Sequence, residues 1–186
     1  MTSQLNVIEL GNPILRQRAE PVKNIKDESI QKLIDELMVT VIQADGVGIA
    51  APQVARSHRL FIMASRPNPR YPKAPYMEPT AIINPKIIGH SSETAKDWEG
   101  CLSVPGIRGL VPRYQTIEVE YCDIPKGDAR SDRNGKLQKL ELTDFVARIF
   151  QHEFDHLEGK VFLDRVESTL DLITEAEYQK LMGIGD

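Results

Sequence analysis

The prediction of the fold depends most on one stretch, TDFVARIFQHEFDHLE at residues 143–158. The stretch contains neither glycine nor proline, and Gly159 follows it as a residue that commonly ends helices, so we predict a helix over 143–158. Apolar side chains lie on more than one face of this helix, so we expect much of its surface to be buried. One stripe at helical spacing includes two histidines: Phe145, Ile149, His152 and His156.

The predicted strands are rich in β-branched or alternating apolar residues. They cover residues 59–63, 80–88, 116–123 and 136–142. We expect the last two to pair as a hairpin, because the connection between them contains Asn134-Gly135, which is a strong signal for a tight turn. The connection as a whole is longer than a two-residue turn.

Two further helices and a long loop complete the expected elements. Residues 27–44 repeat apolar side chains at i, i+3, i+4 and i+7, which predicts an amphipathic helix, and residues 174–177 fit the capping box of a short terminal helix. Residues 65–79 hold five of the 12 prolines and predict a surface loop. With 186 residues, 41% of them hydrophobic, we expect an α+β fold and a single domain over 1–186.

The composition argues against several classes of function. Lysine plus arginine number 23 against 27 acidic residues, whereas nucleic-acid-binding domains are basic, so no DNA partner is expected. Charges interrupt each apolar run well short of the roughly 20 residues of a membrane span, so no membrane partner is expected. The two cysteines, and an N-terminus without the layout of a signal peptide, favour a reducing cytoplasmic location.

The two histidines of the long helix belong to the pattern H-E-x-x-H at residues 152–156. Residues four apart lie on the same side of a helix, so both imidazoles point the same way, as ligands of one metal ion do. Two satisfied core histidines would show the same spacing, and the pattern alone is also common in metallopeptidases. The pattern nevertheless favours a metal-dependent hydrolase in which Glu153 is the acid/base group.

The third metal ligand has one prominent candidate, Cys101. A hydrolytic ion usually takes three protein ligands and keeps one position for water. Cys101 lies in EGCLSVPG at 99–106, where glycines and a proline indicate a tailored backbone rather than a regular core strand. Cys122 has the context of a small buried hydrophobe. A closed structural site that also uses Cys122 remains an alternative.

Three motifs resemble the signature motifs of the peptide deformylases: GVGIAAPQ at 46–53, EGCLS at 99–103 and QHEFDH at 151–156. They occur in the family order, and the resemblance runs from about Leu10 to about Asp164. It implies antiparallel β-sheets packed around a central helix that carries the H-E-x-x-H pattern. It also implies a metal-dependent hydrolase that removes the formyl group from N-formylmethionyl nascent chains and releases formate.

The same resemblance assigns roles to residues of the motifs. It gives the metal three ligands: Cys101, His152 and His156. Glu153 would carry the proton of the attacking water to the leaving nitrogen, and the Gln53 side chain and the Leu102 backbone amide would stabilise the oxyanion. Substrate contacts are expected at six positions: Gly46, Val47, Gly48, Ile49, Gly100 and Arg108.

Two residues have more than one expected role. Arg108 either lies near the mouth of the methionine pocket, as the resemblance implies, or is an exposed, solubilising residue. Asp155 either partners a metal-bound histidine or caps the helix, or it faces solvent.

The resemblance implies ferrous iron as the metal in the cell, with zinc or nickel replacing it in purified protein. Imidazole and thiolate ligands suit all three metals. Residues 171–186 contain four acidic residues and one lysine, a composition poorly suited to tight docking on ribosomal RNA. The expected partners are therefore N-formylmethionyl nascent chains near the ribosome, without tight binding to its RNA.

Overall fold

The structure, a computed structural model, describes residues 3–123 and 135–183. Apart from short 3-10 helices, its helices are α1 (Glu28–Gln43), α2 (Asp144–Leu157) and α3 (Glu175–Met182). Its strands are β1 (Gly48–Ala50), β2 (Leu60–Met63), β3 (Thr80–His90), β4 (Thr94–Cys101), β5 (Val104–Tyr114), β6 (Thr116–Asp123), β7 (Lys136–Thr143) and β8 (Leu172–Thr174).

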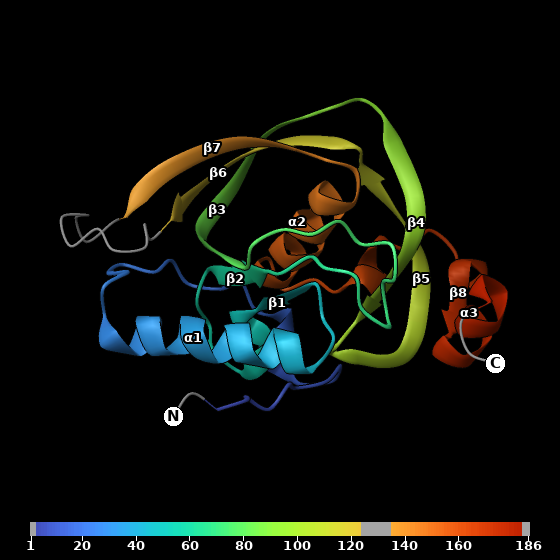
Figure 1. Ribbon diagram of the computed structural model, residues 1–186, viewed down its shortest axis with the longest axis horizontal. Helices are drawn as coiled ribbons and strands as arrows, with labels where there is room; N and C mark the ends of the chain where they lie inside the picture. The colour runs from blue at the N-terminus through green and yellow to red at the C-terminus, as the bar shows by residue number, and fades with distance from the viewer. Residues whose placement is uncertain (1–2, 124–134, 184–186) are drawn as a thin grey trace.

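The strands form two sheets with α2 between them (Figure 1). The larger sheet has the order β1-β2-β3-β6-β7 and the smaller one β4-β5-β8, and every pair of neighbours is antiparallel. β3, β6 and β7 arch over α2, while β4 and β5 run beside it. α1 packs against β1 and β2, and α3 lies against β5 and β8. This arrangement confirms the expected α+β fold with antiparallel sheets around a central helix.

All three predicted helices are confirmed, and local contacts explain where two of them begin. The Asp27 side chain accepts a hydrogen bond from Ser29 N at 2.9 Å and caps α1. The Thr174 hydroxyl accepts from Glu177 N at 3.3 Å and caps α3. Such caps satisfy backbone amides that have no partner within the helix.

The four predicted strands are confirmed as β2, β3, β6 and β7, and the last two pair as expected, with Asp123 opposite Lys136. The predicted tight turn falls partly outside the described residues, at Asn134. The prediction that Cys101 lies outside a regular strand is wrong, because Cys101 is the last residue of β4 and is the register partner of Val104. The register nevertheless shifts between Gly100 and Cys101.

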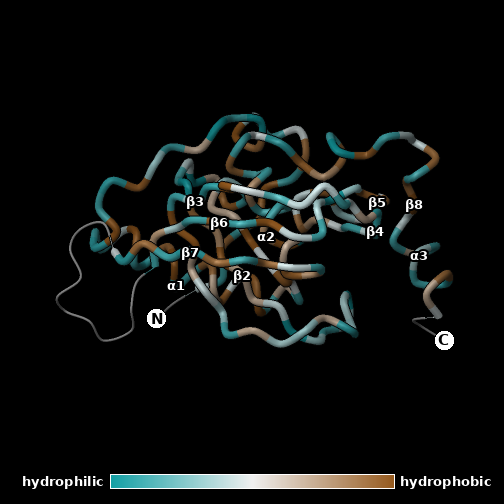
Figure 2. The backbone as a smooth tube through the Cα atoms, turned by 90° about the horizontal axis from the view of Figure 1, so that it is seen from above, coloured by the Kyte–Doolittle hydropathy of each residue, from teal (hydrophilic) through white to brown (hydrophobic). Residues whose placement is uncertain are grey.

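The hydrophobic core lies on both sides of the larger sheet. One cluster of buried side chains joins α1 to β1, β2 and β3, and another joins β2, β3 and β6 to α2. In the second cluster the rings of Phe61 and Phe150 meet edge to face, with centroids 5.1 Å apart. Figure 2 shows the hydrophobic stretches gathered around α2 and the hydrophilic ones along outer loops. In the described ranges, no helix is long and apolar enough to cross a membrane.

Gly159 and Gly183 provide a test of the packing at the end of α2. Both have positive φ, +70° and +63°, and alanine in that region costs roughly 1–2 kcal/mol. A Cβ at Gly159 would also lie 2.8 Å from the carbonyl carbon and oxygen of Arg16, whereas a Cβ at Gly183 would meet nothing within 4 Å. We expect Gly159→Ala to lower the free energy of unfolding by about 3 kcal/mol, the upper end for single substitutions, and Gly183→Ala by about 1 kcal/mol. Urea unfolding measures both, and equal losses would contradict this account.

Candidate active site

α2 and the end of β4 bring the three expected metal ligands together. The ring centroids of His152 and His156 lie 5.2 Å apart, and Cys101 Sγ lies 3.3 Å from His156 Nε2. One ligand atom from each of the three residues lies within 4.8 Å of the others, and all three residues are buried. Burial excludes competing water, so the three side chains can act as a preformed set of ligands.

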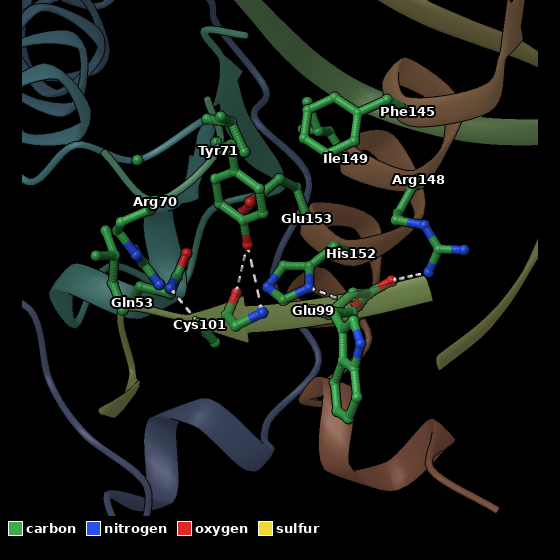
Figure 3. A pocket seen from close by; sticks show the side chains of 16 residues that line it. Gln53, Arg70, Tyr71, Glu99, Cys101, Phe145, Arg148, Ile149, His152 and Glu153 are labelled. Atoms are coloured by element: carbon green, nitrogen blue, oxygen red, sulfur yellow. Dashed lines mark hydrogen bonds and ion pairs between the residues drawn. The ribbon is translucent and has the colours of Figure 1, made fainter. Parts of the chain in front are cut away.

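Glu99 orients the first histidine of the motif. His152 Nδ1 lies 2.9 Å from Glu99 Oε2, which leaves His152 Nε2 as the ring nitrogen available to a metal (Figure 3). Glu99 is two residues before Cys101 on β4, and residues two apart in a strand share a face. The sequence analysis missed Glu99, although this spacing could have indicated it.

The Glu99 carboxylate is buried among positive charges. Arg113 donates to both carboxylate oxygens at 2.9 and 3.0 Å, and Arg148 donates to Oε1 at 2.9 Å. Burial alone would raise the pKa of Glu99, but the Arg113 guanidinium, with help from His152, holds this pKa well below its usual range. The carboxylate therefore stays ionised and can hold His152 in one orientation.

The role expected for Asp155 as partner of a ligand histidine is wrong, and so is the alternative that it faces solvent. Asp155 is 2% exposed and accepts hydrogen bonds from Arg113 and Arg165, each at 2.6 Å. The Arg113 guanidinium therefore bridges two carboxylates, those of Asp155 and Glu99. Asp155 therefore anchors the arginine that neutralises Glu99.

Glu153 lies beside the ligands and forms no ion pair with any residue that the structure describes. It is 4% exposed, and Oε2 has no hydrogen-bond partner among the described residues. Burial raises the pKa of Glu153 to about 7, although His152 and His156 act in the opposite direction. A Cβ at Gly48 would lie 2.5 Å from Glu153 Oε1, so only glycine leaves room for the carboxyl there.

Gln53 presents its amide nitrogen to the site. Its Oε1 accepts from Ala50 N at 2.8 Å, and its Nε2 donates to Ser103 Oγ at 3.3 Å and to Cys101 Sγ at 3.4 Å. The first contact fixes the amide so that its donor faces Cys101. Leu102 lies in the turn after β4 and lines the same cavity.

The cavity beside these groups is largely apolar, and several of its residues were missed in the sequence analysis. Its apolar wall consists of Val47, Tyr71, Trp98, Phe145 and Ile149. Arg70 and Tyr71 come from the proline-rich loop, which is on the surface as predicted but also covers part of the site. The Tyr71 hydroxyl accepts from Gly100 N at 3.3 Å and lies 3.4 Å from Gly100 O, so the loop is tied to β4 (Figure 3). A loop residue reaches the site only through this tertiary contact, which no local pattern reveals.

The expected substrate-binding residues do not all line the cavity. Gly46, Val47, Gly48 and Gly100 line it, whereas Ile49 is fully buried and packs in the cluster beneath α1. Arg108 does not line the cavity either. Its side chain is fully buried and donates to both Glu175 oxygens at 2.8 and 2.9 Å, so its alternative role as an exposed residue is wrong.

The ligand set fits a divalent metal ion. One thiolate and two imidazoles match the three protein ligands of a hydrolytic site, and the buried acid beside them matches its acid/base group. Cys122 lies on β6 and packs against the cluster beneath α1, and it is absent from the candidate metal group found among the described residues. The closed four-ligand site that uses Cys122 is therefore not supported.

The sequence matches the polypeptide deformylase family over residues 4–171. It is 68% identical to Peptide deformylase 2 of Nostoc sp., over 96% of this chain and 94% of that protein, and 47% identical to Peptide deformylase 2 of Shewanella oneidensis, over 87% and 83%. The crystal structure of class I type b peptide deformylase from Acinetobacter baumannii bound to Met-Ala-Ser has a TM-score of 0.81 at 41% identity, covering 89% of this chain and 100% of that one. The chain therefore belongs to the polypeptide deformylase family, the metal-dependent hydrolases that remove the N-terminal formyl group from nascent peptides.

Proposed function

We propose that Cys101, His152 and His156 hold one divalent metal ion and that Glu153 is the acid/base group with which the chain deformylates N-formylmethionyl peptides. The proposed unit is a single catalytic domain over 1–186 that acts in the cytoplasm. The observation that carries the proposal is the position of Glu153, a buried acid whose Oε2 has no protein partner among the described residues, beside three clustered ligands and an apolar cavity.

Cys101, His152 and His156 would hold a metal ion that acts as a Lewis acid. A divalent ion that binds one thiolate and two neutral imidazoles retains a net charge of +1. When bound, the ion supplies Lewis-acid chemistry, which polarises the formyl carbonyl and makes hydroxide available near neutral pH. The thiolate and imidazole ligands suit iron, zinc and nickel alike. From the resemblance to the family we propose ferrous iron as the metal in the cell, with zinc or nickel replacing it in purified protein.

Glu153 moves the proton. It takes the proton of the attacking water as the water oxygen bonds to the formyl carbon, and it gives this proton to the leaving nitrogen as the carbon–nitrogen bond breaks. The products are formate and a peptide with a free N-terminus. Gly48 supports this role, since any larger residue there would displace the carboxyl.

The Gln53 side chain and the Leu102 backbone amide stabilise the oxyanion. The contact between Ala50 N and Gln53 Oε1 holds the amide donor in place before substrate binds, so no reorganisation is required during the reaction. A neutral donor is suited to this position, because it adds no positive charge that would compete with the metal.

The peptide substrate binds as an added strand. β1 is the edge of the larger sheet, and Gly48 in this strand and Gly46 just before it let a peptide main chain approach closely. Gly100 lines the same cavity. The methionine side chain enters the apolar cavity. The relative from Acinetobacter baumannii was crystallised with Met-Ala-Ser, which supports a formyl-Met-Ala-Ser substrate here. Nascent chains near the ribosome are the proposed partners, without tight binding to ribosomal RNA, because α3 and its flanks are acidic.

Glu153→Gln tests the proposed chemistry directly. We expect the rate of formate release from formyl-Met-Ala-Ser to fall by about 10²- to 10⁴-fold, because the proton carrier is lost, while the metal content stays the same. Glu141→Gln, at an exposed position on β7, is the control and should retain full activity. Metal-loaded protein that cleaves internal peptide bonds but leaves the formyl group intact would refute the proposed function.

Gln53→Met tests the oxyanion donor. The substitution keeps the approximate volume but removes the amide donor, so we expect kcat to fall by about 10²- to 10³-fold with little change in KM. Ser103→Ala removes a neighbour of the same amide and serves as the control, with a much smaller loss expected. Steady-state kinetics with formyl-Met-Ala-Ser measure both variants, and similar kcat values for the two would contradict this role.

Metal exchange tests the ligand set. We expect the iron form to lose activity in air, because a thiolate beside iron is vulnerable to oxidation, and the nickel form to stay active. Chelation should abolish activity in both forms, and Cys101→Ala should prevent reloading. Activity is followed over time in air and under nitrogen, and equal air stability of the two forms would contradict the expectation.

A further inference from the structure

Arg70 differs from the other arginines around the active site because, among the described residues, its guanidinium has neither an ion pair nor a hydrogen bond. The guanidinium of Arg70 lies over the ring of Tyr71, at 5.9 Å from the centroid. The other arginines near the site all have partners. Arg66 donates to the carbonyls of Gly46 and Ile42. The rest are paired with buried or half-buried acids: Arg108 with Glu175, Arg113 with Glu99 and Asp155, Arg148 with Glu99, and Arg165 with Asp155. Arg70 is therefore the cation that remains available to a ligand.

The backbone of Arg70 is held in place. Its amide donates to Asn68 Oδ1 at 2.9 Å, and its carbonyl accepts from Arg108 Nη2 at 3.4 Å. The guanidinium reaches towards the end of β4, where Arg70 Nη2 lies 3.2 Å from the point that a Cβ on Gly100 would occupy (Figure 3). Arg70 is half-buried at this position. The backbone that carries this guanidinium is therefore fixed beside the cavity.

The course of a bound peptide leads past Arg70. The reacting end must lie at Gly48, because Glu153 is in contact there. Ala50 does not line the cavity, whereas Gly46 and Val47 do, so a peptide that continues along β1 runs towards Gly46. Beyond Gly46 lies Ala44, which lines a groove next to the catalytic cavity. Arg70 lines both the cavity and the groove, so it marks the place where they meet.

The groove favours a negatively charged side chain. Apart from the proposed metal ligand Cys101, its other charged residue is Glu175, and both oxygens of that carboxylate accept hydrogen bonds from Arg108. The apolar residues Leu102, Val104 and Ile107 form much of the remaining wall and limit the water that screens Arg70. An acid that reaches this place would meet one unpaired positive charge in a partly desolvated setting.

We propose that Arg70 is a specificity-determining residue that binds an acidic side chain at the second or third position of the formyl peptide. This inference rests on the proposed deformylase function and adds a preference among its substrates. Half-buried ion pairs change affinity by a modest factor, so the preference for an acidic over a basic residue is about three- to tenfold in kcat/KM.

The test compares C-terminally amidated peptides, because a free carboxylate would itself occupy Arg70. The peptides are formyl-Met-Ala-Asp, formyl-Met-Ala-Lys and formyl-Met-Ala-Ser amides, together with formyl-Met-Asp-Ala and formyl-Met-Lys-Ala amides. Formate release gives the Asp/Lys ratio of kcat/KM for each position. We expect a ratio of about three to ten at one of the two positions, and a smaller ratio at high salt.

Variants of Arg70 separate charge recognition from other roles. Arg70→Gln should bring the ratio to about one, and Arg70→Glu should invert it. Lys73→Gln changes an exposed charge in the same loop, outside the cavity and the groove, and should leave the ratio unchanged. Thermal unfolding of each variant checks that the fold is intact, and a ratio of rate constants is independent of the fraction of active protein.

Two results would overturn the proposal. A ratio near one in the unaltered enzyme excludes charge selection. An equal loss of kcat/KM for every peptide in Arg70→Gln, with the ratio unchanged, assigns Arg70 to the peptide backbone instead. If the unaltered enzyme does not hydrolyse the formyl-Met-Ala-Ser amide at all, it is the deformylase function that fails, and this outcome is distinct from both.

Discussion

The buried carboxylate of Glu99, on β4, links the smaller sheet to helix α2. Arg113 connects it to β5, while Arg148 and His152 connect it to α2. A buried charge that loses one partner destabilises a protein by about 3–5 kcal/mol. The pairing of β4 with β5 and the position of α2 must therefore both be correct for Glu99 to keep all its partners. Cys101 is two residues further along β4, and the approach of its sulfur to the histidines depends on the same pairing and position. Stability of the fold and geometry of the site therefore share one interaction.

Periodicity predicted those elements of the fold that bury one continuous apolar face. α1, α2 and the strands β2, β3 and β6 have such a face, and each was found within a few residues of its predicted bounds. β7 was also found at its predicted position, although Leu137 and Leu140 on it are exposed. β4 and β5 gave no signal, because β4 reads TAKDWEGC and β5 contains two prolines and two glycines. Their pairing is stabilised by the charges of Glu99, Arg113 and Arg148 across elements, and a local window of sequence does not contain those contacts.

The candidate site was predictable wherever its residues are close in sequence. His152, Glu153 and His156 follow from helical spacing, and Cys101 from its short motif. The residues that were missed contact partners far away in the sequence. Glu99 binds His152, which is 53 residues away, and Tyr71 is hydrogen-bonded to Gly100, which is 29 residues away. Arg108 was predicted as a site residue but does not line the cavity. Its place near a motif gave no information about its burial against α3.

The edge strand β1 contains three residues, and within the described part of the chain it pairs with one neighbour only. An edge of this length offers main-chain hydrogen bonds that almost every peptide can form, the cavity beside it accommodates one side chain, and the preference proposed for Arg70 is modest. Little binding energy is left for holding the rest of a chain, so bound peptides should dissociate rapidly. An enzyme that binds its substrates in this way accepts many different peptide sequences and releases each peptide soon after the reaction.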